Sequence, residues 1–101
     1  MKSAALLFTA VVACVPAHAN LALAQKHACT ACHAVDKKIV GPSYQDVAKK
    51  YATQKDAAAA LAASIKAGGA GKWGPVPMPA QPALSDADLK TLAAWILGGA
   101  R

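Results

Sequence analysis

The chain has 101 residues, of which 55% are hydrophobic, and its formal net charge at pH 7 is +6. This length fits a single domain, and so small a domain usually needs a disulfide, a metal or another staple to support its core. The basic charge comes without a nucleic-acid-binding motif. We therefore expect no nucleic acid as a partner and treat much of the charge as solvated surface.

The N-terminal residues are typical of a secretory signal. Lys2 supplies a positive charge, residues 4–15 form an apolar stretch, and the run A-H-A that ends at Ala19 fits a cleavage site. A membrane span needs roughly 20 apolar residues, so this shorter stretch predicts no span. We expect residues 1–19 to be a cleaved signal peptide and residues 20–101 to be one exported domain.

An alternative is lipid attachment at Cys14, because the run V-V-A-C loosely resembles a lipoprotein site. The hydrophobic run before Cys14 is short and the A-H-A run lies further on, so cleavage after Ala19 is favoured. That cleavage leaves two cysteines, Cys29 and Cys32, and one methionine, Met78.

The exported part predicts an all-α fold of about four short helices, with no credible strand pattern and no repeat. Residues 20–31 are rich in good helix formers and should form a first helix that ends at the C-T-A-C-H run. Ser43 fits an N-cap for a second helix, whose apolar residues recur at helical intervals: Tyr44, Val47, Ala48 and Tyr51. An alanine-rich third helix follows Asp56 and ends at the glycine pair of residues 68–69.

A proline-rich segment separates the third helix from the last. Met78 lies within residues 70–84, among Pro75, Pro77, Pro79 and Pro82, and no helix can cross that density of proline. Ser85, with an acidic residue three positions later, resembles a capping box. It starts an amphipathic last helix, whose apolar residues are Leu89, Leu92, Ala93 and Ile96.

The run C-T-A-C-H, from Cys29 to His33, is a C-x-x-C-H motif and indicates attachment of a c-type haem. Each thiol can bond one vinyl group of the haem, and His33 can place its imidazole under the iron. Residues at these spacings share one face of a helix, so both sulfurs and the ring can meet the same macrocycle. The predicted cofactor is one haem c, bound covalently through Cys29 and Cys32. It would supply the apolar centre that so small a chain lacks.

Other uses of C-x-x-C fit less well. A thioredoxin-like site expects a βαβ context, which is absent from the predicted elements, and a structural disulfide is common in exported proteins. A zinc site needs four ligands, and the available set is too crowded for an ordinary finger: Cys29, Cys32, His33 and His27. The adjacent histidine, the export signal and the distant P-M-P run together favour haem. His27 is expected to be a surface residue near the haem pocket.

Met78 is the natural sixth ligand of the iron, with His33 as the fifth. A thioether is a neutral ligand that favours ferrous iron and raises the reduction potential relative to a second nitrogen ligand. A lone methionine more often fills core space. The alternating prolines around Met78 argue against that reading. They fix φ and remove backbone donors, as suits a stiff strap across a haem face.

The chain resembles the small bacterial class I cytochromes c, in particular the cytochrome c-551 (cytochrome c8) type. The resemblance spans nearly all of residues 20–101 and rests on the segments C-T-A-C-H (29–33), V-G-P (40–42), W-G-P-V-P-M-P (73–79) and L-A-A-W-I-L (92–97). It implies one haem c, iron ligation by His33 and Met78, and a monohaem carrier of single electrons in the periplasm. It also implies that the first and last helices cross around Leu23 and Trp95.

The resemblance assigns roles to further residues. The Pro42 carbonyl would accept the second N–H of the axial histidine and orient its ring, and Trp73 would donate its indole N–H to a haem propionate. Gln81 stands where the family carries an Asn near the methionine sulfur, and its extra methylene leaves that hydrogen bond open. Two positions depart from the family pattern: Ser64 replaces an arginine that helps anchor a propionate, and Ala24 replaces an aromatic residue of the first helix.

We expect an outer-sphere electron-transfer protein rather than an enzyme, because two permanent axial ligands leave the iron no site for oxygen or substrate. Lys37, Lys38 and Lys72 flank the ligand-bearing segments and would present a basic rim to an acidic surface on a redox protein partner. The protein is expected to act as a monomer. The rival hypothesis is a gas sensor or redox enzyme, in which Met78 is displaced or weakly bound and the sixth site is open.

Overall fold

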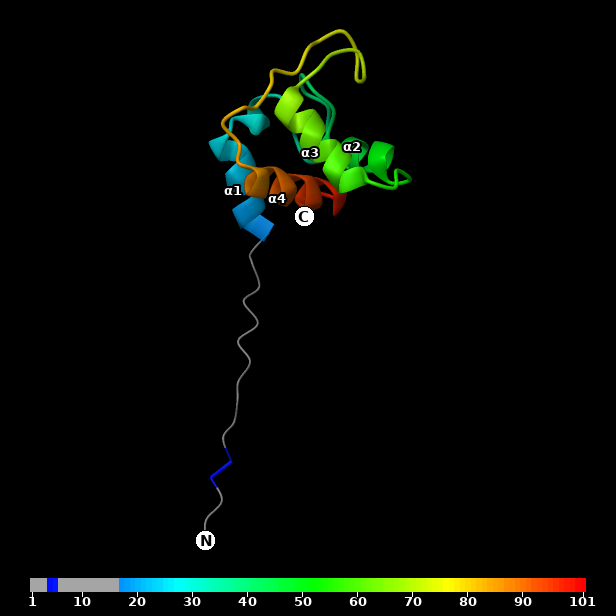
Figure 1. The fold of residues 1–101 in the computed structure, drawn as a ribbon. Coiled ribbons are helices and arrows are strands. Elements are labelled where there is room, and N and C mark those ends of the chain that lie inside the picture. Colours follow the sequence, from blue (N-terminus) through cyan, green and yellow to red (C-terminus); the bar gives the residue numbers. More distant parts are fainter. Residues whose placement is uncertain (1–3, 6–16) are drawn as a thin grey trace.

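The computed structural model describes residues 4–5 and 17–101, and this part of the chain is all-α. In chain order the elements are α1 (Ala17–Lys26), the 3₁₀-helix η1 (Cys29–Ala31), α2 (Tyr44–Tyr51), α3 (Ala57–Ala67) and α4 (Asp86–Leu97) (Figure 1). Extended pairing over the described residues is limited to two isolated bridges, His33 with Lys38 and Gly69 with Met78. The prediction of an all-α fold with about four short helices is confirmed.

The predicted signal segment is covered only in part. Lys2, Cys14 and most of the expected apolar stretch lie outside the described residues, so the signal peptide and its cleavage stay predictions. Residues 17–19, which contain the expected cleavage site, begin α1. Within the described ranges, no helix is long and apolar enough to cross a membrane.

The central helix of the fold is α4. It packs against α1, α2 and α3, and Figure 1 shows α1 on one side of it and the other two helices on the opposite side. Its buried residues follow the predicted helical spacing: Leu89, Leu92, Ala93, Trp95 and Ile96. Full burial of one large apolar side chain contributes roughly 1.5–3 kcal/mol, so this one face supplies a large share of the hydrophobic core.

The contact between α1 and α4 that the resemblance implies is present. Ala24 of α1 is 1% exposed, Trp95 of α4 is 6% exposed, and Leu23 is partly buried against the same core. Ala24 has only a methyl group at the position where the resemblance implies an aromatic ring. Ala24 is therefore fully buried at the contact with α4, but its methyl group adds little apolar area to that contact.

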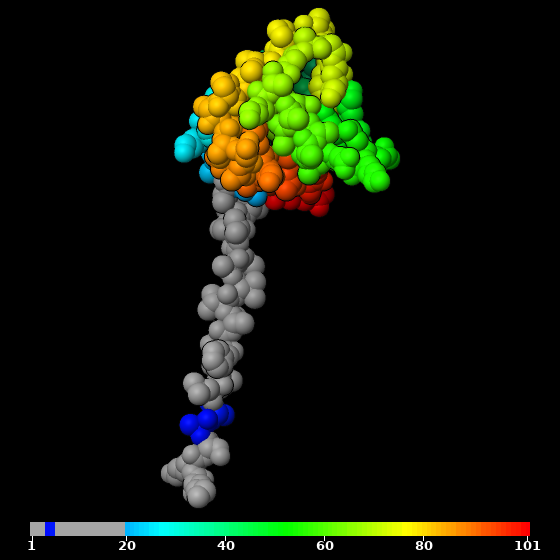
Figure 2. All heavy atoms as spheres, viewed as in Figure 1, coloured from blue at the N-terminus to red at the C-terminus, as the bar shows by residue number. Residues whose placement is uncertain are grey.

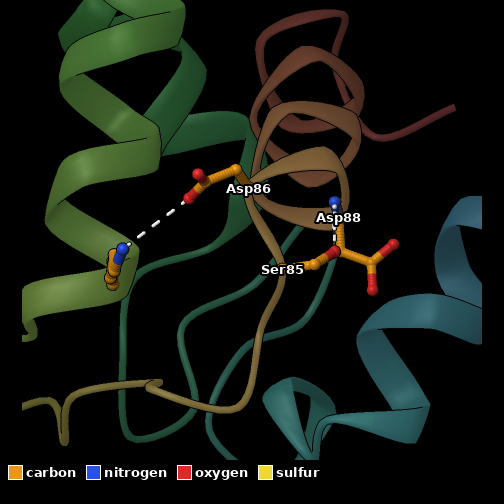
Figure 3. A network of polar contacts seen from close by, with 4 residues as sticks. Ser85, Asp86 and Asp88 are labelled. Carbon is orange, nitrogen blue, oxygen red and sulfur yellow. Dashed lines mark hydrogen bonds and ion pairs between the residues drawn. The ribbon is translucent and has the colours of Figure 1, made fainter.

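Serine side chains cap two helices as predicted. Ser43 Oγ accepts a hydrogen bond of 3.0 Å from the main-chain N–H of Asp46, and Ser85 Oγ accepts one of 3.1 Å from Asp88. Figure 3 shows the second cap and, beside it, Asp86 turned toward the ammonium group of Lys66, 3.6 Å away. Each cap satisfies an otherwise unpaired N–H and is worth about 1 kcal/mol, which fixes where α2 and α4 begin.

The first helix ends earlier than predicted. We expected it to run from residue 20 to 31, but α1 ends at Lys26 and the chain reverses at Ala28, which has φ 60° and ψ 19°. A left-handed residue cannot continue an α-helix. Cys29 to Ala31 then form a 3₁₀ turn, and the N–H of His33 donates to the carbonyl oxygen of Cys29 at 2.9 Å. The C-T-A-C-H run is therefore a separate tight turn.

Candidate cofactor site

A cavity of about 300 Å³ lies between the turn after α1, the helices α2 and α3, and the loop from α3 to α4. Figure 2 shows a hollow beneath the yellow-green loop, with teal atoms of the segment before α2 inside it. Apolar side chains dominate the lining. Residues singled out in the sequence also line it: Cys29, Cys32, His33, Pro42, Trp73 and Met78. The fold thus brings together residues from both ends of the domain.

The His33 ring is held in one orientation. Its Nδ1 donates a hydrogen bond of 2.7 Å to the carbonyl oxygen of Pro42, as the resemblance implies. The Tyr44 ring stacks on it, with 5.5 Å between centroids and an interplanar angle of 27°. On a third side Gly41 approaches so closely that an added Cβ would lie 2.5 Å from His33 Cε1. With its proton on Nδ1, the imidazole keeps the Nε2 lone pair free to bind a metal.

Cys29 and Cys32 are free thiols, both partly exposed. Burial raises the pKa of the Cys29 thiol, and the nearby Cys32 adds to this effect, although a backbone hydrogen bond opposes it. Thiol-disulfide enzymes and zinc sites need the thiolate, which such an environment disfavours. Over the described residues, no group of three or more His, Cys, Asp or Glu side chains could hold a metal ion. The hypothesis of a zinc site therefore gains no support from the described residues.

Met78 reaches the cavity from a loop that is closed at its base. Gly69 and Met78 exchange two backbone hydrogen bonds, from Gly69 N to Met78 O at 3.0 Å and from Met78 N to Gly69 O at 2.7 Å. The Met78 side chain is partly buried and packs against the hydrophobic core. Gly68 has φ 65°, and an added Cβ there would lie 2.5 Å from the Met78 carbonyl oxygen. Two glycines thus let the loop close tightly and hold Met78 at the cavity.

The wall of the cavity carries a polar cluster that the sequence analysis did not predict. Lys72 Nζ donates to the Tyr51 hydroxyl at 2.9 Å, and this hydroxyl shares a hydrogen bond of 3.3 Å with Ser64 Oγ. Burial alone would raise the pKa of Tyr51, but the hydrogen bonds from Lys72 and Ser64 and the nearby ammonium charges lower it. Tyr51 was identified only as an apolar position of α2. Its hydroxyl partners lie 13 and 21 residues away, so no local pattern reveals them.

Other predicted residues lie less centrally. Gln81 is not among the lining residues of the cavity, and its Nε2 donates to the Pro79 carbonyl oxygen at 3.3 Å. The sequence left undecided whether Gln81 bonds the Met78 sulfur, and this structure does not form that hydrogen bond. His27 is partly buried, and its Nε2 is buried without a partner among the described residues. Lys38 and Lys72 line the cavity, whereas Lys37 is exposed outside it.

The residues present fit a covalently attached haem. The cavity joins two thiols, an oriented imidazole and a thioether, and these are the donors that a c-type haem uses. Gly41 and Gly68 leave room where any larger residue would displace His33 or Met78. An all-α domain with these four side chains at one cavity is typical of one class: small haem proteins whose cofactor is attached at a C-x-x-C-H turn.

Comparison with known proteins gives the family. A sequence model of the family described as Cytochrome c matches residues 21–100. Cytochrome c-551 of Allochromatium vinosum is 50% identical over 91 residues, which cover 90% of this chain and 97% of that protein. The crystal structure of Nitrosomonas europaea cytochrome c552 superposes with a TM-score of 0.76 at 52% identity, covering 78% of this chain and 98% of the other. The class 1 cytochrome MtoD of Sideroxydans lithotrophicus has a TM-score of 0.70 at 32% identity, covering 87% and 100%.

This chain belongs to the cytochrome c family, and within it to the small class I cytochromes of the c-551 type. Its cofactor is one covalently bound haem c, with Cys29 and Cys32 as the attachment cysteines. It is an electron-transfer protein and not an enzyme. The resemblance inferred from sequence motifs is confirmed.

Proposed function

We propose that the protein is a periplasmic one-electron carrier whose haem iron is held between His33 and Met78. The observation that carries this proposal is the fixing of both side chains at one cavity. His33 is oriented by the 2.7 Å hydrogen bond to the Pro42 carbonyl, and Met78 by its backbone pairing with Gly69. The bound haem supplies the reversible one-electron chemistry.

The protein's own groups determine how that chemistry is used. The Nδ1–H hydrogen bond holds the His33 ring in one tautomer, with Nε2 free to bind the iron. The Met78 thioether adds no charge, which favours the reduced iron. Because both side chains are held by backbone contacts, they can stay in place when the iron changes charge. Two permanent ligands also leave no coordination position open to oxygen or substrate.

The test of the ligand set is spectroscopic. We expect the oxidised protein, purified from a host that attaches haem c, to show the far-red charge-transfer band of methionine-ligated iron, and the reduced protein to bind no carbon monoxide at neutral pH. Met78→Ala should abolish the band and permit carbon monoxide binding. Val76→Ala, which removes an exposed apolar side chain from the same loop, should preserve both properties. Carbon monoxide binding by the unmodified protein would instead favour the sensor or enzyme hypothesis.

The surface around the cavity supports docking of a redox protein with an acidic face. Lys38 and Lys72 lie at the cavity, and Lys50 Nζ lies 4.4 Å from the centroid of the Trp73 ring. Val40 and Val76, which also line the cavity, are 49% and 60% exposed. An apolar patch with basic neighbours fits brief contact with a complementary acidic surface, and such attraction weakens with salt. We propose that the protein docks as a monomer.

Small redox reagents test this basic surface without a known partner. We expect oxidation by ferricyanide, an anion, to slow as salt is added, and oxidation by a cationic cobalt(III) complex to accelerate. A double variant, Lys38→Gln with Lys72→Gln, should weaken both dependences. Lys90→Gln removes one exposed charge from α4, outside the cavity lining, and should change them much less. Rates that do not depend on ionic strength would contradict the proposal.

Export is tested on the purified protein. The proposed cleavage after Ala19 predicts a periplasmic protein whose N-terminal sequence starts at Asn20 and whose intact mass is that of residues 20–101 with one haem. Cys14→Ser should leave this product unchanged. If lipid were attached at Cys14 instead, the protein would fractionate with membranes and the variant would lose that behaviour.

A further inference from the structure

Lys72, Tyr51 and Ser64 form a hydrogen-bonded cluster in the cavity wall. Lys72 comes from the loop after α3, Tyr51 from the end of α2 and Ser64 from α3, and all three line the cavity. The Lys72 ammonium lies 2.9 Å from the Tyr51 hydroxyl and 5.3 Å from the centroid of the Tyr51 ring. Tyr51 is only 3% exposed, so a buried side chain fixes the direction of a flexible lysine.

The charge of Lys72 has no acidic partner. The only ion pair within 4.0 Å in the described part of the chain joins Lys66 to Asp86. An ammonium group has three donors, and the Tyr51 hydroxyl accepts one of them. The remaining donors are available at the cavity wall.

A second cation lies at the same rim. Lys50 Nζ donates to the Lys72 carbonyl oxygen at 3.1 Å and lies over the Trp73 ring. Two positive charges close to each other repel, and a nearby anion offsets that repulsion. The charges of Lys50 and Lys72 also contribute to the lowered pKa of Tyr51. The titratable groups that these contacts join are Lys50 and Tyr51 from α2 and Lys72 from the loop, and none of the three is a carboxylate.

We propose that Lys72, positioned by Tyr51 and Ser64, binds a carboxylate of the haem and thereby raises the reduction potential of the iron. A haem carries two carboxylates, and a charge-assisted hydrogen bond from an ammonium group is among the strongest that one can form. The resemblance drawn from the sequence implies that Ser64 replaces an arginine. Here the serine holds Tyr51, and the cation comes from the loop. The inference rests on the proposed haem site and adds a positioning role for Tyr51.

The sign of the effect follows from electrostatics. A cation beside a haem carboxylate offsets its negative charge, which otherwise stabilises the more positive, oxidised iron. Removing the Lys72 charge should therefore lower the midpoint potential. It should also raise the pKa of the carboxylate by about one unit, a tenfold change in proton affinity.

The experiment compares single variants of the holoprotein. Lys72→Gln should lower the midpoint potential and move the carboxylate titration, followed by NMR of the haem carboxyl carbons, to higher pH. Lys72→Arg should keep both near their original values. Tyr51→Phe removes the hydroxyl but keeps the ring, and should shift both in the direction of Lys72→Gln. Lys49→Gln, at an exposed lysine on the same helix as Tyr51, controls for the loss of one surface charge.

Two outcomes would overturn the proposal: a potential shift for Lys72→Gln no larger than that for Lys49→Gln, or an unmoved carboxylate titration. The far-red methionine band is recorded on every sample. A normal band with unshifted potentials refutes the role of Lys72 and leaves the proposed ligand set intact. A missing band in the unmodified protein refutes the proposed ligand set instead.

Discussion

Gly41 and the His33 ring are in such close contact that a Cβ atom on residue 41 would lie 2.5 Å from Cε1, 2.9 Å from Nδ1 and 3.2 Å from Nε2 of the imidazole. Real Cβ atoms do not come this close to other side chains, so any larger residue would push the ring away. The neighbouring Pro42 carbonyl accepts the Nδ1–H hydrogen bond. Gly41 and Pro42 together therefore set the position and the rotation of the candidate iron ligand.

We predict that Gly41→Ala displaces His33 and destabilises the holoprotein. Overpacking of this kind typically costs about 1–3 kcal/mol, which lowers Tm by about 4–8 °C for each kcal/mol in a domain of this size. Thermal unfolding and the haem absorption spectrum measure the two effects. Gly98→Ala is the matched control, because its Cβ would make only ordinary contacts of 3.4 and 3.5 Å. Equal Tm values for the two variants would show that the close contact at Gly41 is not needed.

A second prediction concerns the neck of the methionine loop. Gly68→Ala combines an unfavourable φ of 65° with a Cβ placed 2.5 Å from the Met78 carbonyl oxygen. We expect it to shift Met78 and to weaken the far-red methionine band, which should disappear at a lower temperature than in the unmodified protein. Gly71→Ala has φ 89° but nothing within 4 Å of its Cβ, so it carries the backbone penalty without the collision. If both variants lose the band equally, backbone strain and not contact with Met78 is responsible.

Local signals in the sequence predicted most of the fold. Ser43 and Ser85 cap the helices they were expected to cap, because an N-cap is decided by a side chain and a backbone group three residues away. The apolar spacing predicted for α4 matched its buried face, because residues three or four positions apart share one side of a helix. The predicted end of α1 was wrong, because the prediction rested on the Leu, Ala, Gln and Lys residues that lie mostly before residue 27. The left-handed Ala28 that stops the helix reflects the tight turn of the motif beyond it.

The candidate site was predicted where a motif carries it and missed where distant contacts build it. C-x-x-C-H and P-M-P named Cys29, Cys32, His33 and Met78 directly, and the structure places all four at one cavity. The hydroxyl of Tyr51 depends on Lys72, a residue 21 positions away in a different element. Contacts of this kind follow from the packing of α2, α3 and the loop, and sequence spacing does not encode them.

A third prediction concerns the start of α4, the central helix. Ser85→Ala removes the acceptor for the Asp88 N–H and should lower the free energy of unfolding by about 1 kcal/mol. Ser85→Asp supplies another acceptor and should recover most of the loss, helped by the positive end of the helix dipole. Chemical denaturation of the three holoproteins measures the differences. The midpoint potential should not change, because Ser85 is not among the residues lining the cavity.

The last prediction is a pH dependence of stability that Tyr51 contributes. Burial opposes ionisation, but the Lys72 and Ser64 hydrogen bonds and the ammonium charges outweigh it and lower the pKa of Tyr51 below its usual value of about 10. The folded protein therefore releases this proton at lower pH than the unfolded chain does. The resulting stabilisation is fully present above the unfolded pKa and is lost as pH falls through the folded pKa.

Between pH 8 and pH 10, the unmodified protein should thus gain stability relative to Tyr51→Phe. The gain should be smaller when Lys72→Gln is present in both proteins, because the ammonium that favours the phenolate is then absent. Chemical denaturation at several pH values measures both differences, and a stability difference that stays constant over this range would contradict the predicted shift.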